Sequence, residues 1–391
     1  MTRPVVLLCL LIFGSTFAVG AFPVLLPDIG RATGIDDFAL GVLAGAFGFA
    51  RLVADIPAGL LITHHLRQAL VVGAGAVTAG ILCLAFGAPY ELLVAGRLLS
   101  GFGHTLVMLG GITGIVRHAR SGSHGLALNA YEMSGMLGIL GGMVGAGFLP
   151  RDWPWNVTIL VASTPQFVGL AVLPALLRAL PVDAGSAGAP LFSRGLQDDD
   201  GGGARSASRL TALAFVAGAL LAVAWSAIGQ FLLPLRASRE FGLDRDGVAL
   251  LLAIPQLVDV LVLLPLGSLA DRGSRARVLA AVLLVLAAGV AAVAFGPLSL
   301  VIAGCVFFGV GLASWMLPVA LLNRDGLSQR VAWRTALYRV GVDAGVFLGP
   351  VLSGLLAARS MLWIVGVATS AALVVVSMAL LRASGRERAG L

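Results

Sequence analysis

The chain has 391 residues, of which 59% are hydrophobic and only 12% are charged, a composition that no soluble domain of this length needs. The net charge of +7 would suit a nucleic-acid partner, but the basic residues stand in short segments between long apolar runs, where membrane topology explains them. The three cysteines all fall inside apolar runs, so neither a disulfide framework nor a metal site is expected, and no cofactor is implied. The composition predicts an integral membrane protein, and no grouping of side chains typical of an enzyme is visible.

Six apolar segments come before residue 181, and each is long enough to cross a bilayer of about 30 Å as a helix. The first, residues 5–26, is too long for the core of a signal peptide, so it is expected to be retained. Residues 27–37 are predicted to form a loop, and the sequence THHLRQ at 63–68 is predicted to be a turn. The other predicted helices of this half cover residues 38–62, 69–88, 92–116, 126–149 and 157–180.

Residues 181–209 make up the one long polar stretch, which is rich in Gly, Ser and Asp and is typical of a flexible linker. Six more apolar segments follow it, at 210–235, 247–270, 278–295, 298–322, 335–358 and 362–381. The sequence therefore predicts an all-α membrane protein of about twelve transmembrane helices. Its expected domains are a bundle of six helices at 1–180, a linker at 181–209 and a second bundle of six helices at 210–391.

Residues in the first half of the chain match residues 207 or 208 positions further on, in the second half. The agreement holds in order at four separate places, which chance does not readily produce even with 52 glycines. It indicates two homologous halves related by pseudo-symmetry. At a shift of 208 residues, Pro57 and Gly59 match Pro265 and Gly267, Gly34 and Asp36 match Gly242 and Asp244, and Gly101 and Gly103 match Gly309 and Gly311; at a shift of 207, Tyr131 matches Tyr338.

The distribution of the arginines predicts the orientation in the membrane. With both termini on one side, seventeen arginines fall on that side, six fall on the other and three lie inside predicted helices. Because basic residues concentrate in cytosolic loops, both termini and the linker are expected in the cytosol. The six outer arginines are Arg31, Arg151, Arg236, Arg239, Arg245 and Arg359.

A charged turn between two predicted helices carries the most specific motif of the chain. Residues 267–275, GSLADRGSR, resemble the loop signature G-x-L-x-D-R-x-G-R of the major facilitator superfamily, with serine in place of the second glycine. The first glycine would let a neighbouring helix approach closely, and the aspartate would dock against an arginine or the positive end of a helix. In the first half, Thr63 stands where the repeat places this aspartate. The resemblance implies a cytosolic gate loop formed by Gly267, Asp271, Arg272 and Arg275.

The fourth predicted helix carries a second resemblance. Arg97, Gly101 and Gly103 match the signature R-x-x-x-G-x-G, which the superfamily associates with proton handling in drug/proton antiporters. The fifth helix departs from the antiporter pattern, because Gly141–Gly142 stands where those exporters have a Gly-Pro step. Its many glycines are expected to let helices pack closely. His104 follows the signature, and a lone histidine here is more often a hydrogen-bonded interior residue than a proton relay.

Seven charged residues lie inside predicted helices, where each costs on the order of 3 kcal/mol at the bilayer centre, so they are expected to face a cavity or one another. Two arginine–aspartate pairs have the i, i+4 spacing that lets each pair neutralise itself. No basic residue stands within a turn of Asp259 on its helix, and the repeat pairs Asp259 with Arg51. The repeat likewise pairs Glu132 with Arg339, so opposite charges could meet across a central cavity. We hypothesise that Asp259 or Glu132 binds and releases protons during transport. Further proton-coupling candidates are Asp55 and Asp343, and candidates for substrate binding or charge pairing are Arg51, Arg97, Arg339, His104 and Gln256.

The resemblance covers essentially the whole chain and implies a secondary transporter that works by alternating access. Its expected substrate is a small molecule, its expected direction is efflux, and protons are the expected coupling ion. Proton-symport uptake of a metabolite or anion, using Arg51 or Arg339, is the alternative within transport. A non-transporting sensor or scaffold is the alternative from another class, although such a protein has no reason to bear the cost of charges inside the membrane. The expected setting is the bacterial cytoplasmic (inner) membrane, where the protein contacts the lipid bilayer as a monomer and binds no nucleic acid.

Overall fold

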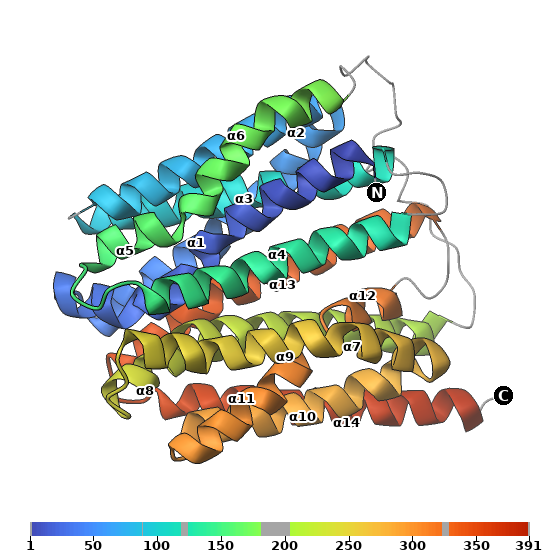
Figure 1. Ribbon diagram of the computed structural model, residues 1–391. Helices are drawn as coiled ribbons and strands as arrows, with labels where there is room; N and C mark the ends of the chain where they lie inside the picture. Colours follow the sequence, from blue (N-terminus) through green and yellow to red (C-terminus); the bar gives the residue numbers. More distant parts are fainter. Residues whose placement is uncertain (1, 88, 119–123, 181–203, 323–327, 390–391) are drawn as a thin grey trace. The chain divides into compact units, whose positions relative to one another are not determined.

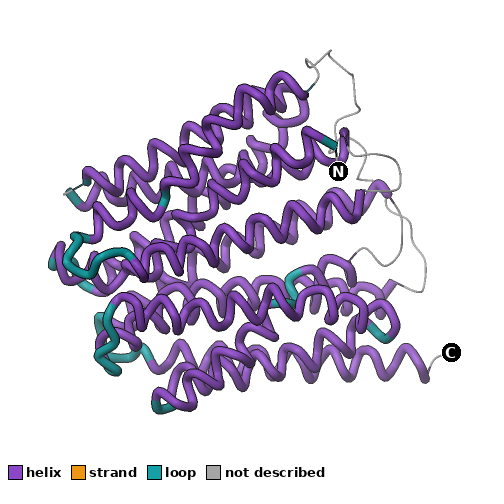
Figure 2. Tube along the Cα trace, in the orientation of Figure 1, coloured by secondary structure: helices purple, strands orange, loops and turns teal. Residues whose placement is uncertain are grey.

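The computed structural model describes residues 2–87, 89–118, 124–180, 204–322 and 328–389. Every regular element in these ranges is a helix, and ten helical segments are long and apolar enough to cross a membrane (Figures 1 and 2). One of the ten, α2 (Asp37–Phe86), has 50 residues and is long enough at 1.5 Å per residue to cross twice. A further helix, α4 (His124–Phe148), has 25 residues. The chain is therefore an all-α membrane protein, as predicted, and these lengths fit about twelve crossings.

The first helix, α1 (Arg3–Thr33), is longer than predicted, and the loop expected at residues 27–37 is wrong over most of its length. Two prolines lie inside the helix, and each removes one backbone hydrogen bond. The helix nevertheless continues, because Leu26 and Ile29 are completely buried around the second proline. Gly34 ends it in the left-handed conformation at φ 67°, which glycine adopts without steric cost.

The second predicted turn, at residues 63–68, is reduced to a kink. The helix continues on both sides of it, and only His65 has non-helical backbone angles, φ −138° and ψ 53°. The helix begins at an N-cap in which the Asp36 side chain accepts a hydrogen bond of 2.7 Å from the backbone N–H of Ala39. The kink therefore divides α2 into the second and third membrane crossings without a separate loop.

The remaining helices of the first half surround a common core. Leu66 and Leu70 of α2, Leu106 of α3 and Tyr131 of α4 belong to one buried apolar cluster. Glycines bring the helices together, since a Cβ added at Gly142 of α4 would overlap the backbone of α1. The close packing expected of the fifth predicted helix is therefore present. The bounds are α3 (Tyr90–His118), α5 (Trp155–Ala162) and α6 (Thr164–Ala179).

The helices of the second half begin inside the predicted linker. The first of them, α7, starts at Ala204, and residues 181–203 of the linker lie outside the described residues. It continues through a nine-residue π-helical segment, η1, a form that is rare and frequently found at functional sites. The elements are α7 (Ala204–Val223), η1 (Ala224–Leu232), α8 (Leu233–Arg239), α9 (Arg245–Arg272), α10 (Arg275–Phe295), α11 (Leu298–Leu312), α12 (Met316–Leu322), α13 (Ser328–Ala357) and α14 (Trp363–Ala389).

The chain divides into two compact units. The first unit is Met1–Gly188 together with Pro234–Ala253, and the second is Ala189–Leu233 together with Ile254–Leu391. The first unit thus includes a segment from the second half of the sequence. This segment carries most of α8 and the start of α9.

The local geometry of the two halves of the sequence repeats at the shifts found there. Gly34 and Gly242 are the two glycines with positive φ among the described residues, at 67° and 62°. The hydroxyl of Tyr131 donates to the carbonyl of Val107 at 2.9 Å, and that of Tyr338 donates to the carbonyl of Trp315 at 3.1 Å. Matching backbone turns and matching hydrogen bonds support an internal repeat.

A glycine contact repeats in the same way and gives a test of the packing. A Cβ at Gly101 would overlap the carbonyl oxygen of Phe47, and one at Gly309 would overlap that of Pro255, again 208 residues further on. Gly101→Ala is therefore expected to lower stability by about 1–3 kcal/mol, because backbone atoms must shift to admit the methyl group. Gly59→Ala is the matched control, since no described atom lies within 4 Å of its added Cβ. Thermal unfolding in detergent, followed by tryptophan fluorescence, should show a lower Tm for Gly101→Ala alone; equal Tm values would contradict the close approach.

Candidate functional site

Arg97 of α3 is held inside the first unit by aromatic rings. Its side chain is buried, and its guanidinium carbon lies 3.7 Å from the centroid of the Phe22 ring of α1 and 4.9 Å from that of the Phe47 ring of α2. One guanidinium N–H also donates to the carbonyl of Ala44 at 3.4 Å. A desolvated cation over an aromatic face gains up to about 2 kcal/mol or more. This arrangement explains how α3 carries a buried charge.

Two further candidate residues lie close to the ring of Phe47. The guanidinium carbon of Arg51, one turn along α2, lies 5.7 Å from the ring centroid. The buried imidazole of His104 lies 5.5 Å from the same ring, centroid to centroid. The structure thus brings Arg51, Arg97 and His104 together around one aromatic side chain. Asp55 of α2 and Glu132 of α4 are both half-buried.

The second unit holds buried carboxyl groups. Asp259 of α9 is 3% exposed, and Gln256, one turn before it, is 5% exposed. Asp343 of α13 is completely buried, and a nitrogen of Arg339 lies 3.9 Å from one of its carboxylate oxygens. The predicted i, i+4 pair of α13 is therefore present at long ion-pair distance. Buried carboxyl groups on membrane helices are expensive, and such groups mark proton or substrate pathways.

The motif of residues 267–275 covers the end of α9, the two-residue connection and the first residue of α10. Asp271 lies in the last turn of α9, and Arg275 begins α10. Arg275 forms an ion pair of 3.2 Å with Asp271 and donates to the carbonyl of Ala320 in α12 at 3.3 Å. The aspartate therefore docks against an arginine, as expected. A Cβ at Gly267 would meet no described atom within 4 Å, so the close helix approach expected there is not observed.

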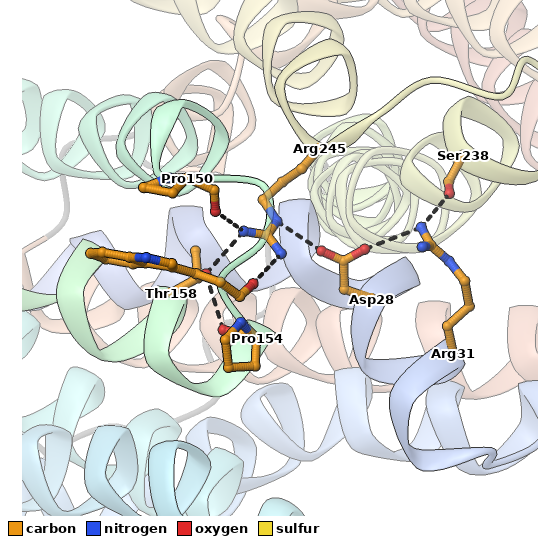
Figure 3. Close-up of polar contacts among 8 residues, drawn as sticks. Asp28, Arg31, Pro150, Pro154, Thr158, Ser238 and Arg245 are labelled. Carbon is orange, nitrogen blue, oxygen red and sulfur yellow. Dashed lines mark hydrogen bonds and ion pairs between the residues drawn. The ribbon is translucent and has the colours of Figure 1, made fainter.

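A polar network that the sequence did not predict joins the start of α9 to the first half of the chain (Figure 3). Arg245, whose side chain is 7% exposed, forms an ion pair of 2.8 Å with Asp28 of α1. Its other N–H groups donate to Thr158 of α5 at 3.0 Å and to the carbonyls of Trp153 at 2.9 Å and Pro150 at 3.3 Å (Figure 3). One buried guanidinium thus ties together α1, the loop after α4, and α5. We call these contacts the Asp28–Arg245 network.

Further contacts of Asp28 extend the network. The second carboxylate oxygen of Asp28 lies 3.1 Å from Arg31, which also donates to the hydroxyl of Ser238 at 3.1 Å (Figure 3). Asp28 therefore forms ion pairs with an arginine of its own helix and with Arg245 of α9. Both oxygens of this carboxylate are used by charged donors, which make hydrogen bonds stronger than those between neutral groups.

Exposed ion pairs connect the segment Pro234–Ala253 to the first half of the chain at two more points. Arg151 reaches Asp244 and Asp246, both at 2.7 Å. The hydrogen bond to Asp246, with the charges of Asp246 and Asp244, raises the pKa of Arg151 above its ordinary value. Arg239 binds both carboxylate oxygens of Asp37, at 2.8 and 3.0 Å. At least one partner of each of these pairs is open to solvent. Loss of any one pair is therefore expected to cost less free energy of folding than loss of the buried Arg245.

The sequence offered only one signal for this network. Arg31, Arg151, Arg239 and Arg245 all belong to the six arginines that the topology prediction placed outside. Nothing in the spacing pairs position 28 with position 245, because ion pairs between distant segments leave no periodic pattern. The contact between them had to come from the structure.

Comparisons with known proteins agree with this architecture. The family model of the Major Facilitator Superfamily matches residues 8–235 and 210–390. The structure is similar to the nucleoside transporter NupG, with 14% identity, 98% of this chain and 99% of that chain covered and a TM-score of 0.74. It is similar to a POT family transporter in complex with a thioalcohol-conjugated peptide, with 14% identity, coverage of 98% and 96% and a TM-score of 0.80. It is also similar to a bacterial homolog of the human lysosomal transporter Spinster, with 14% identity, coverage of 98% and 98% and a TM-score of 0.71.

At these identities the solved structures establish the fold alone. No curated protein matches the chain in sequence. The family model, however, spans both halves of the chain, and this agrees with the two motifs and the internal repeat. The chain belongs to the major facilitator superfamily and is a membrane transport protein, not an enzyme.

Proposed function

We propose that this protein exports a small molecule across the membrane by alternating access, in exchange for protons. The observation that carries the proposal is the presence of buried carboxyl groups on membrane helices, above all Asp259 on α9. A buried carboxylate costs free energy that protonation removes, so gain and loss of a proton can favour different conformations. We infer that Asp259 carries the proton, with Asp343, Glu132 and Asp55 as the other candidates.

Arg97 supports the antiport direction of this proposal. Its signature, Arg97-x-x-x-Gly101-x-Gly103, resembles the one that the superfamily associates with proton handling in antiporters. The two aromatic rings hold the guanidinium inside the first unit, where its charge can act on nearby titratable groups. Proton-symport uptake is the second candidate, because buried cations such as Arg97 also suit an anionic substrate.

The Asp28–Arg245 network is proposed as the outer gate of the transport cycle. It fastens Pro234–Ala253 to the ends of α1 and α5, and alternating access requires such a closure to break and reform. The arginine count favours an orientation with these loops outside and both termini in the cytosol, which we propose for a bacterial cytoplasmic membrane. Opening of this end would require one buried and several exposed ion pairs to break.

The proposal is tested in proteoliposomes under an imposed pH gradient. A panel of dyes, drugs, sugars and organic acids is added, and movement of each compound is followed at opposite gradients. We expect at least one compound to accumulate on the side of higher proton concentration, against its own gradient, and to stop when an ionophore collapses the pH difference. Accumulation on the opposite side would support symport. Accumulation that the ionophore leaves unchanged would contradict proton coupling.

A further inference from the structure

The surface of the first unit carries a groove that transport does not explain. It has a volume of about 420 Å³ and is lined by Arg67, Gln68, Val71 and Val72 of α2 and by Leu177 of α6. Val71 and Val72 are 42% and 46% exposed, while Arg67 is half-buried. Since α2 and α6 both belong to segments long and apolar enough to cross a membrane, we expect the apolar part of the groove to face acyl chains.

Among the described residues, the charged end of this groove is basic. Arg67 stands two residues after the kink at His65, and the exposed Arg178 follows Leu177 directly. Arg117 of α3 lies near the same kink, since it donates to the carbonyl of Thr63 at 3.0 Å. The described segments 60–72, 112–118 and 172–180, which contribute these side chains, contain no aspartate or glutamate. The surface therefore attracts an anion at the point where the apolar groove begins.

We propose that this groove binds an anionic phospholipid. Arg67 contacts the phosphate of the headgroup, and one acyl chain lies along Val71, Val72 and Leu177. An arginine suits this place because its stem packs on apolar surface while its guanidinium pairs with phosphate. An anionic lipid is preferred over a zwitterionic one because a basic residue that contacts the headgroup favours a negative charge there by about fivefold.

Native mass spectrometry of the full-length protein tests the proposal. The protein in detergent is incubated with equal amounts of phosphatidylglycerol and phosphatidylcholine of the same acyl chains, and bound lipids are counted. The wild type is expected to retain phosphatidylglycerol over phosphatidylcholine by about fivefold or more. Arg67→Gln is expected to lower this ratio by about fivefold. Val72→Trp, which fills the apolar groove without changing the charge, is expected to lower the retention of both lipids.

The control variant is Arg277→Gln, which removes an equal charge from an exposed position of α10 in the second unit. It is expected to leave the lipid ratio unchanged. A ratio near one for the wild type, or an equal loss in Arg277→Gln and Arg67→Gln, would overturn the proposal. Displacement of phosphatidylglycerol by inorganic phosphate alone at millimolar concentration would also overturn it, because the site would then recognise a free anion and not a lipid.

Discussion

Arg245→Gln is expected to raise hydrogen exchange in residues 24–33 and 150–158 by roughly a hundredfold, because removal of one partner of a buried ion pair costs about 3 kcal/mol or more. The variant loses the pair with Asp28 and leaves Thr158 and two backbone carbonyls without their donor. Glutamine is too short to reach all four acceptors. Hydrogen exchange measured by mass spectrometry on the protein in detergent gives the change in the free energy of local opening.

Arg151→Gln is the matched control for this prediction. It also removes one positive charge that contacts the segment Pro234–Ala253, but its pairs with Asp244 and Asp246 are open to solvent. Little change in exchange is therefore expected. Asp28→Asn should act like Arg245→Gln, and the double variant should add little to either single one, since both remove the same contact. Equal exchange in Arg245→Gln and Arg151→Gln would contradict the outer-gate assignment.

Asp259→Asn is expected to abolish proton-driven accumulation of the substrate and to leave exchange of substrate across the membrane largely intact. Asparagine has nearly the same shape as a protonated aspartate but can neither release nor bind a proton. A transporter fixed in this form can still carry substrate back and forth, but the imposed pH gradient no longer drives it. The loss in accumulation should be at least tenfold, which is about 1.4 kcal/mol of coupling.

The control for Asp259→Asn is Asp152→Asn, at an exposed position in the loop between α4 and α5. Both accumulation and exchange should match the wild type in this variant. Asp343→Asn then separates the two buried carboxyl groups, because it leaves Arg339 beside a neutral amide. Accumulation that persists in Asp259→Asn and disappears in Asp343→Asn would move the proton-carrying role to α13.

Sequence reasoning reached the membrane fold because apolar runs of fixed length and arginine-rich loops are physical requirements of the bilayer. It placed the motif turn at Asp271 and Arg275 from local spacing, and it matched Gly34 with Gly242 from the shift of 208 residues between the halves. It missed the last turns of α1, because a proline in a buried helix is tolerated when neighbouring side chains pack around it. The helix propensity of a segment carries no information on how neighbouring side chains pack around it.

The candidate site likewise contains residues that the sequence could single out and contacts that it could not. Arg97, His104, Asp259 and Asp343 could be singled out because charged or titratable groups inside apolar segments are rare. The aromatic partners of Arg97 could not, because they come from α1 and α2 and no spacing links them to α3. The Asp28–Arg245 pair joins residues 217 positions apart, so only the folded chain brings it together.

The measurement that tests proton coupling most directly uses one transported compound and no initial pH gradient. A pH-sensitive dye is enclosed in the proteoliposomes, the compound is added outside, and the lumenal pH is recorded. Coupled antiport predicts that protons leave the lumen as the compound enters, so the lumenal pH rises with the rate of transport and stays constant in Asp259→Asn. Entry of the compound at the same rate with no change in lumenal pH in the wild type would contradict it.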